Sequence, residues 1–431
     1  MKKAHVVIGL AAVVMMCLGA DHGGAFVAKM GFPGGKVRMD HDQAGVLHIA
    51  WVNGGVRYAR SLDGGATWQD YGIVPGSSDV YEWWVSVSGD SEGNGHIVYS
   101  SGLQRLYYNK FDGTSWTGKE TAYTGHLPIV PGITVDTSGQ VFVSMKVEAA
   151  GEGWTISCVR RNPQTGQWSG KEVLSQIGVY EPGAAFMDAD DQGRVACVWQ
   201  SGRPAIPRSR VFENGAWSGI RSLPGRGGAG DPFVAFGQDG KMVATWAEYT
   251  NTGSGWIIDG IFMSHYTTSW SPAVRVSPNS DLQGDVWPCT TIDENGITWI
   301  SWTEGKFSAA HCWLAAYSES DGWLYRQTLP YNVAQWSSVI DGKGDRIYVV
   351  WDSAEGLYFD SFNVGAWPGQ RIHGDIDIDG WCDGEDLIRL SIAFGTQNGH
   401  PKWDAGADLD NNGTIDGNDL AVIGANFGMS N

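Results

Sequence analysis

The stretch DDQGRVACVW, residues 190–199, places a turn directly before a strand. Asp followed three positions later by Gly is typical of a tight turn, and the apolar residues after it predict a β-strand that ends on a large side chain. The pattern recurs in DQAGVLHIAW (42–51), DSEGNGHIVY (90–99), DTSGQVFVSM (136–145), DENGITWISW (293–302) and DGKGDRIYVVW (341–351), and GQDGKMVATW (237–246) keeps it without the leading Asp. Copies at a period of roughly 50 residues indicate a repeat architecture of the size of propeller blades.

A second repeat follows the first along the chain. A turn followed by Trp occurs at Trp68, Trp116, Trp168, Trp217, Trp270, Trp323 and Trp367. Short apolar segments precede each Asp-x-x-Gly unit and flank each Trp turn, so every repeat predicts four antiparallel strands. Seven such sheets bury their faces by packing around an axis, and we therefore predict an all-β, seven-bladed β-propeller over residues 34–372. A β-sandwich, the alternative, does not explain the sevenfold period.

The first Trp turn carries a family resemblance. Its sequence SLDGGATW, residues 61–68, has the pattern Ser-x-Asp-x-Gly-x-Thr-Trp and resembles the Asp box of sialidase-like, or BNR-repeat, propellers. DGTSW (112–116) is a weaker version in the next repeat. The resemblance implies a structural turn on the side of the propeller away from the ligand, so these residues are not candidates for catalysis.

Composition and the amino terminus indicate export. The net charge of −18 argues against nucleic acid or an anionic membrane surface as a partner. MKKAHVVIGLAAVVMMCLGA, residues 1–20, has two lysines, an apolar run and a small-residue end, and is interpreted as a secretory signal peptide. No other segment approaches the ~20 apolar residues of a membrane span. The five remaining cysteines have neither the spacing of a disulfide framework nor that of a zinc site.

Residues 373–431 form an acidic segment with two calcium-loop patterns. DIDIDGWCDGED (375–386) and DLDNNGTIDGND (408–419) place oxygen ligands at alternate positions around a central Gly, which is the EF-hand arrangement. The sequence therefore predicts two calcium ions. Their ligands would be Asp375, Asp377, Asp379, the backbone carbonyl of Trp381, Asp383 and Asp386, and in the second loop Asp408, Asp410, Asn412, the carbonyl of Thr414, Asp416 and Asp419.

The paired loops, each followed by an apolar helix ending in Phe-Gly, resemble a type I dockerin. The resemblance implies a small α-helical domain that folds with calcium and docks to a cohesin-bearing partner. Positions 10 and 11 of the loops depart from the hydroxyl residues that dockerins commonly use for cohesin contact, because they are Gly384-Glu385 and Gly417-Asn418. Calcium binding is therefore a safer expectation than docking to any particular cohesin.

Propeller ligands usually bind the face formed by the loops that lead into the innermost strands and by those joining the second and third strands. Here these loops combine carboxylates, cations and Trp, which suits a polysaccharide or glycan, because Trp stacks on sugar rings while charges orient hydroxyls or pair with uronates. The candidate catalytic residues are Glu82, Tyr180, Glu181, Asp231 and His126, and the candidate substrate-binding residues are Trp83, Arg203, Glu248, Trp287 and Trp336.

Three functions remain open on this sequence. Val-Tyr-Glu occurs twice, at 80–82 and 179–181, and a Tyr beside a Glu resembles the activated tyrosine of sialidases, which favours a glycoside hydrolase. The sialidase Phe/Tyr-Arg-Ile-Pro signature is absent. A polysaccharide lyase would use a His or Tyr base and a cation, with His126, Tyr180, Arg203 and Arg226 as candidates. A glycan-binding lectin would need similar pockets in several blades, whereas the loops differ between blades and so favour a single site.

Overall fold

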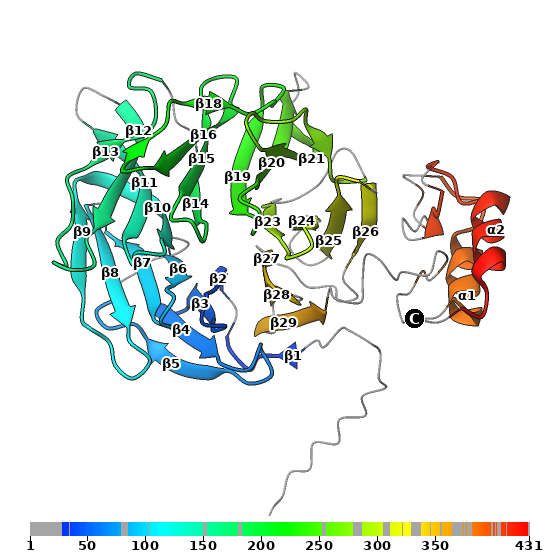
Figure 1. The fold of residues 1–431 in the computed structure, drawn as a ribbon, viewed down its shortest axis with the longest axis horizontal. Helices are drawn as coiled ribbons and strands as arrows, with labels where there is room; N and C mark the ends of the chain where they lie inside the picture. The colour runs from blue at the N-terminus through cyan, green and yellow to red at the C-terminus, as the bar shows by residue number, and fades with distance from the viewer. Residues whose placement is uncertain are drawn as a thin grey trace, which may run out of the picture.

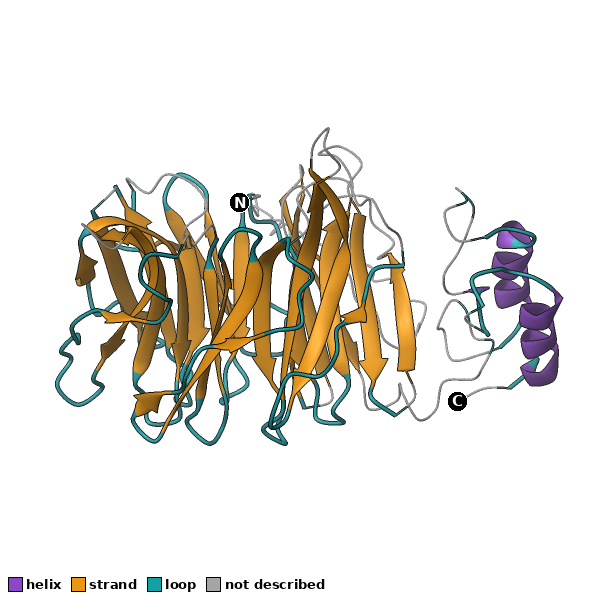
Figure 2. Ribbon diagram, turned by 90° about the horizontal axis from the view of Figure 1, so that it is seen from above, coloured by secondary structure: helices purple, strands orange, loops and turns teal. Residues whose placement is uncertain are grey.

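The computed structural model describes residues 28–33, 35–78, 85–102, 104–149, 153–179, 183–251, 256–278, 287–304, 311–320, 322–328, 338–344, 346–353, 356–363, 374, 376, 382–397, 400, 402, 407–410 and 412–429. Within this part of the chain, seven antiparallel sheets stand around an axis, and this arrangement confirms the predicted seven-bladed β-propeller (Figure 1). Among the described residues, α-helices occur only in the C-terminal segment (Figure 2). No helix in the described residues is long and apolar enough to cross a membrane.

The strands of each blade follow one another from the axis outwards in chain order, and the seventh blade is completed by β1 as its outermost strand. The innermost strands are β2 (Val37–His41), β6 (Val85–Gly89), β10 (His126–Val135), β14 (Ala185–Ala189), β19 (Ala229–Phe236), β23 (Cys289–Ile292) and β27 (Ser338–Lys343). The second strands are β3 (Leu47–Val52), β7 (Gly95–Ser101), β11 (Val141–Ala149), β15 (Val195–Ser201), β20 (Met242–Asn251), β24 (Thr298–Glu304) and β28 (Arg346–Ser353).

The outer strands complete the sheets. The third strands are β4 (Val56–Ser61), β8 (Arg105–Phe111), β12 (Gly153–Arg161), β16 (Ile206–Glu213), β21 (Trp256–Tyr266), β25 (His311–Ser318) and β29 (Gly356–Asn363). The outermost strands are β5 (Gln69–Ile73), β9 (Glu120–Thr124), β13 (Glu172–Val173), the pair β17 (Ala216–Trp217) and β18 (Arg221–Ser222), β22 (Val274–Arg275), β26 (Gly322–Thr328) and β1 (Ala28–Lys29).

The Asp-x-x-Gly repeat forms the turn between the first and second strands of a blade. In five blades the Oδ1 atom of the leading Asp accepts a hydrogen bond from the backbone N–H four residues later, as from Ile297 to Asp293 at 2.9 Å. The Gly takes a left-handed conformation, with φ +77° at Gly296, which other residues adopt only at a cost. The motif is therefore a side-chain-capped turn whose residue types are set by its backbone.

The second oxygen of this Asp fixes the following strand in several blades. Trp299 Nε1 donates to Asp293 Oδ2 at 2.8 Å, and the Nε2 atoms of His48 and His96 lie 2.7 and 2.9 Å from the carboxylates of the equivalent Asp residues. Both imidazoles are buried, with 0% and 2% exposure. The two histidines therefore act as packing residues.

The Trp turns connect neighbouring blades. In the turn 61–68, Asp63 accepts hydrogen bonds from the N–H and hydroxyl of Thr67, and the Trp68 ring lies edge-on to Phe359 of the seventh blade at 5.2 Å. A Cβ atom on Gly65 would overlap the same Phe359 ring. Trp116, Trp168, Trp217 and Trp270 likewise contact residues of the preceding blade. Trp367 lies outside the described residues.

The hydrophobic core is divided into clusters that lie between blades. Each of six clusters combines residues from adjacent sheets, and the largest joins the sixth, seventh and first blades. The large side chains that end the Asp-x-x-Gly repeats are fully buried in them: Trp51, Tyr99, Met145, Trp199, Trp246, Trp302 and Trp351. Burial of one such side chain stabilises the fold by roughly 2 kcal/mol.

Ring closure uses both ends of the propeller. The seventh sheet has the order β1-β29-β28-β27, so its outermost strand comes from the amino-terminal part of the chain. Ala28 pairs with Phe359 and Lys29 with Tyr358. The first and last parts of the propeller are thus hydrogen-bonded into one blade, which prevents the ring from opening at this seam.

Seven residues of the innermost strands share one register position near the axis, and we call them the inner ring: Asp40, Ser88, Thr134, Asp188, Ala235, Thr291 and Asp341. Each of the three Asp residues accepts a hydrogen bond from a backbone N–H of the next blade. Gly89 donates to Asp40 at 2.6 Å, Phe236 to Asp188 at 2.7 Å and His41 to Asp341 at 2.6 Å. The ring carboxylates therefore link blade one to two, four to five, and seven to one.

The C-terminal segment contains α1 (Gly384–Ala393) and α2 (Gly417–Asn426), related by a repeated pattern of backbone pairing. Gly395, after α1, donates to Ile415 O, and Ile415 donates to Thr396 O. In the same way Gly428, after α2, donates to Cys382 O, and Cys382 donates to Met429 O. Each predicted calcium loop is thereby paired with the chain that follows the other helix, around a small core that includes Leu390 and Ile423.

Replacing Asp293 tests the capped turn. Asp293→Ala removes one buried carboxylate that accepts two backbone bonds and one indole bond, and we expect the free energy of unfolding to fall by roughly 3 kcal/mol. The matched control is Asp136→Ala, because Asp136 caps the same turn but is more exposed and should cost only about 1 kcal/mol. Chemical denaturation measures both, and equal losses would contradict a special role for the buried carboxylate.

The inner ring predicts a pH dependence of stability. Burial, together with the negative charges of Asp40 and Asp190, raises the pKa of Asp188 to about 7, against the bonds from Phe236 N and Ala189 N. The folded state therefore holds the proton more strongly than the unfolded chain, and stability falls as pH rises from about 4 to about 7. Asp188→Asn keeps an acceptor for Phe236 and removes the charge.

We expect Asp188→Asn to match the unmodified chain at pH 4 and to be more stable at pH 8, by up to roughly 4 kcal/mol, in a chelating buffer. Thermal unfolding of both proteins across this pH range measures the difference. A variant that is less stable at pH 8 would show that the ionised carboxylate stabilises the ring.

Candidate functional site

A second ring of inward residues lies two positions before the inner ring on the innermost strands. Arg38, Phe186, Phe233, Cys289 and Val339 belong to this level. They line both a cavity on the inner-ring side and, on the opposite side next to the starts of the innermost strands, a small pocket of about 10 Å³, which has room for about one water. We call this pocket the axial mouth. It lies on the face where the sequence places the ligand, and its remaining described lining residues are Asp231, Trp287, Pro288 and Ser338.

Asp231 reaches the axial mouth because β19 is irregular. The pairing of β19 with β20 shifts between Gly230 and Phe233, and Asp231 in this bulge has φ +49°, a left-handed conformation that is uncommon outside Gly. The Tyr249 hydroxyl lies 3.5 Å from Asp231 Oδ2. Bulges of this kind redirect side chains next to functional sites, and a strained backbone is often kept where it positions a reacting group.

Two cations lie against the Trp of the mouth. Lys36 Nζ is 4.3 Å from the centre of the Trp287 ring, and the Arg38 guanidinium is 5.7 Å from it. Both side chains are largely buried, with 7% and 9% exposure. Burial lowers the pKa of Arg38, while the nearby Cys289 and Asp231 oppose that shift. The mouth therefore combines a half-buried aromatic ring, two cations and a carboxylate.

Glu248 lies on the neighbouring strand β20 of the same blade as Asp231, and it is not among the described residues that line the axial mouth. It pairs across the sheet with Ala229, two residues before Asp231, and is only 3% exposed. Its Oε1 atom accepts hydrogen bonds from Trp246 Nε1 at 2.6 Å and from Arg226 N at 3.0 Å. Burial raises the pKa of Glu248 despite these bonds. One blade thus offers a buried carboxyl that favours its protonated form and a second, more exposed carboxylate.

The other predicted site residues have different positions. His126 is exposed, and its Nδ1 atom lies 2.9 Å from Glu148 at the outer end of the β10–β11 pair. Arg203 is exposed and precedes a cis proline. Neither is among the described residues that line the axial mouth. Glu82, Trp83, Tyr180, Glu181 and Trp336 lie outside the described residues, and their roles stay predictions.

The structure also brings in two residues that the sequence analysis missed, Lys36 and Arg38. The sequence contained a signal for Arg38. Residues 38 and 40 are two positions apart on the first innermost strand, so their side chains lie on the same face of the strand and both face the axis. At the position of Arg38 the other blades carry Ser86, Gly132, Phe186, Phe233, Cys289 and Val339. A lone Arg among small and apolar residues marks a special position.

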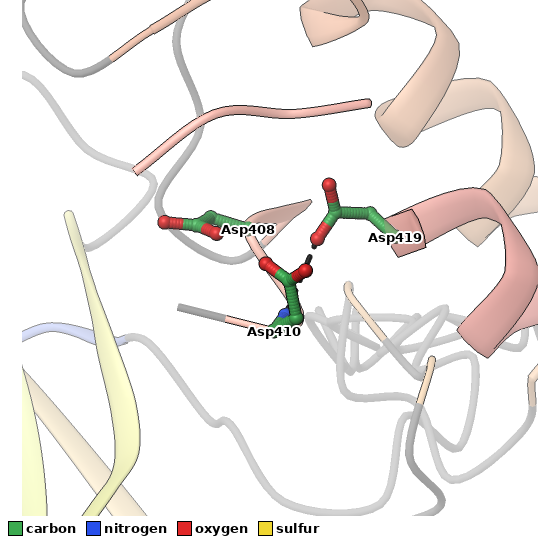
Figure 3. Close-up of side chains that lie close together, drawn as sticks. All are labelled: Asp408, Asp410 and Asp419. Carbon is green, nitrogen blue, oxygen red and sulfur yellow. Dashed lines mark hydrogen bonds between the residues drawn. The ribbon is translucent and has the colours of Figure 1, made fainter. Parts of the chain in front are cut away.

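The second acidic loop of the C-terminal segment has the donor arrangement of a cation site. Ligand oxygens of Asp408, Asp410 and Asp419 all lie within 4.8 Å of one another (Figure 3). Gly413 N donates to Asp408 Oδ2 at 2.9 Å, and Leu409 N donates to Asp419 Oδ1 at 2.7 Å. Asp408 is 8% exposed, and its Oδ1 atom has no hydrogen-bond partner. A buried carboxylate oxygen without a donor fits a hard cation such as calcium.

The described part of the first loop repeats this network. Asp386 Oδ1 accepts from Ile376 N at 2.5 Å and its Oδ2 from Asp383 N at 2.8 Å, which matches the bonds that Asp419 makes with Leu409 and Asp416. Asp383 and Asp416 also cap the helices α1 and α2. Asp375, Asp377, Asp379 and Trp381 lie outside the described residues.

Comparison with known proteins identifies no family by sequence. No family profile matches the chain, and no curated protein matches it. Among solved structures, a PL25 ulvan lyase bound to -[GlcA(1-4)Rha3S]- is 11% identical, with a TM-score of 0.46 over 63% of this chain and 78% of that one. The α-L-arabinanase of Penicillium chrysogenum is 12% identical, with a TM-score of 0.46 over 80% and 98%. AofleA from Arthrobotrys oligospora is 12% identical, with a TM-score of 0.46 over 72% and 90%. These likenesses assign no activity to this chain.

Proposed function

We propose that this chain is a secreted carbohydrate-active propeller that binds and hydrolyses an acidic polysaccharide at the axial mouth. We further propose that its C-terminal segment holds two calcium ions and attaches the propeller to a cohesin-bearing partner. The observation that carries the first part is the meeting of Asp231, Arg38 and Trp287 in one pocket at the axis. The signal peptide, residues 1–20, supplies the expectation of export.

The chemistry of the mouth suits a charged sugar. An indole ring offers a flat apolar surface to a pyranose, and Lys36 and Arg38 beside it would neutralise a carboxylate or sulfate on that sugar. Because both cations are largely buried, their attraction for an anionic group is screened less than at an open surface.

Hydrolysis needs two carboxyl groups with different proton affinities near one glycosidic bond. Glu248, whose pKa is raised by burial, would act as the acid, and the more exposed Asp231 would act as nucleophile or base. Their places on adjacent strands of one blade give each a rigid support. Arg226, whose N–H donates to Glu248, would hold the acid in position.

A polysaccharide lyase is the second candidate, and the Tyr249 hydroxyl beside Asp231 favours it. A lyase abstracts the proton next to a uronate carboxylate that a cation has neutralised. Tyr249 would be the base, and Arg38 would bind the uronate. The two reactions differ in their products, because only the lyase leaves an unsaturated uronate that absorbs in the ultraviolet.

The activity is tested on purified full-length mature protein with calcium and a set of acidic and neutral polysaccharides, following reducing ends and ultraviolet absorbance together. We expect reducing ends from an acidic polysaccharide without absorbance. Asp231→Asn and Glu248→Gln should each lower kcat at least ~100-fold, because each removes an acid or base catalyst. The control is Asp239→Asn, on the turn at the opposite end of the same blade.

Other outcomes would change the assignment. Reducing ends with rising absorbance, lost in Tyr249→Phe, would establish the lyase. Binding without either product would leave a lectin. Activity retained in both carboxyl variants would place the reaction outside the axial mouth.

Calcium is proposed for both acidic loops because they share one hydrogen-bond network and because Asp408 Oδ1 has no donor. When bound, the ion neutralises the clustered carboxylates. The helices α1 and α2 have ten residues each, and helices this short are marginal in water without tertiary support. The repulsion between Asp408, Asp410 and Asp419 would otherwise destabilise the segment.

Removal of calcium should therefore melt the C-terminal helices while the propeller stays folded. We expect chelation to lower helical circular dichroism and to expose residues 373–431 to protease, and Asp408→Ala to weaken calcium binding at one loop. Glu385→Ala, at a loop position that supplies no ligand, is the matched control. Unchanged helix content and protease resistance in chelator would refute the calcium-dependent fold.

Attachment to a partner is supported by apolar side chains on the outside of the helices. Leu387, Ile388, Ile392 and Phe394 of the α1 repeat and Phe427 after α2 are between 39% and 62% exposed. Exposed apolar residues in such a small segment indicate a binding surface. The cohesin assignment itself rests on the resemblance of the sequence to dockerins.

A further inference from the structure

A cavity of about 220 Å³ lies on the axis on the inner-ring side of Arg38. Besides the inner ring, it is lined by the Asp residues that begin four Asp-x-x-Gly turns: Asp42, Asp90, Asp136 and Asp190. These four carboxylates are engaged in turn caps, and three of them also pair with His48, His96 or Arg194. The ring carboxylates Asp40, Asp188 and Asp341 are not paired with any described Lys or Arg.

The cavity has a strong excess of negative charge. Among its described lining residues, Arg38 is the single Lys or Arg, and the groups that favour its charged form are Cys289, at the same level, and Asp231 in the axial mouth. Each ring carboxyl keeps lone pairs beyond those that accept backbone bonds, which for Asp188 and Asp341 include bonds from Ala189 N and Gly342 N as well as the interblade bond.

Two hydroxyl groups point to a ligand independently of the carboxylates. Thr134 and Thr291 occupy inner-ring positions, line the cavity and are 5% and 4% exposed. Neither side chain has a hydrogen-bond partner within the described part of the chain. Buried hydroxyls normally have a partner, so these two require one inside the cavity.

We infer that the axial cavity binds a hydrated divalent cation, held by the carboxylates of Asp40, Asp188 and Asp341 and by the hydroxyls of Thr134 and Thr291. All five donors are oxygens, which suit hard cations such as magnesium or calcium. The donors come from the first, third, fourth, sixth and seventh blades, so the ion would join strands that are distant in the sequence.

The ion must keep water ligands, because the ring is wide. The three ring carboxylates are not gathered within the 4.8 Å span that Asp408, Asp410 and Asp419 share. The volume is sufficient for an ion with several waters, which would donate their hydrogens to the carboxylates and to the Thr hydroxyl oxygens. Retention of water is the usual behaviour of magnesium in proteins.

The test counts ions in a chain whose C-terminal loops have been disabled. Full-length mature protein carrying Asp386→Ala and Asp408→Ala is freed of metal, dialysed separately against magnesium and calcium, and analysed for bound metal. We expect this background to retain about one ion per chain for at least one of the two metals. Adding Asp188→Asn and Asp341→Asn should abolish that ion, whereas adding Asp239→Asn should leave it.

The hydroxyl variant Thr134→Val with Thr291→Val keeps all carboxylates and side-chain shapes. It should weaken binding by roughly fivefold for each hydroxyl, which also guards against misfolding of the carboxylate variants. Absence of bound metal from the loop-disabled chain, or equal metal in the ring variants, would overturn the axial site. If instead the unmodified and loop-disabled chains bind the same amount, the calcium proposal for the C-terminal segment fails and the axial site is unaffected.

Discussion

The structure depends on one constraint, which is that no blade can bury its own apolar faces. A four-stranded sheet has two of them, and the six core clusters all lie between sheets. Every blade therefore needs two neighbours, and the last must meet the first. The pairing of β1 with β29, the contact of Trp68 with Phe359 and the bond from His41 to Asp341 all act at this seam. Three kinds of interaction thus close the ring, at its rim, between its sheets and at its axis.

Ring closure also decides where functional side chains can gather. The innermost strands alternate between residues that pack against the next blade and residues that face the axis, and only the latter converge. On the first innermost strand, Arg38 lines the axial mouth and Asp40 lines the axial cavity. The axial mouth and the axial cavity therefore both result from this alternation of side chains along the innermost strands. The apolar residues Phe186 and Phe233 line both of them and lie at the level between them.

The sequence predicted the blades because their turns are local. Asp293 and Gly296 form a complete unit within a few residues, so the motif survives in isolation and its repetition is visible. Long-range features left weaker signals. β1 is two residues long and pairs across almost the entire propeller, the positive φ in the β19 bulge falls on Asp231 and not on a Gly, and the inner ring consists of single residues about fifty positions apart. Their partners are set by the closure of the ring and not by neighbours in the chain.

The same difference between local and long-range features separates the two clusters of aspartates in this protein. In the C-terminal segment, Asp408, Asp410 and Asp419 are brought together by a single loop, so their spacing is readable as a motif. At the axis, Asp40, Asp188 and Asp341 stand on three blades, so no local spacing predicts that they converge. Carboxylates of a loop can move apart when charge repels them. Those of the axis are fixed by interblade bonds, so their repulsion has to be relieved by protons or by a cation.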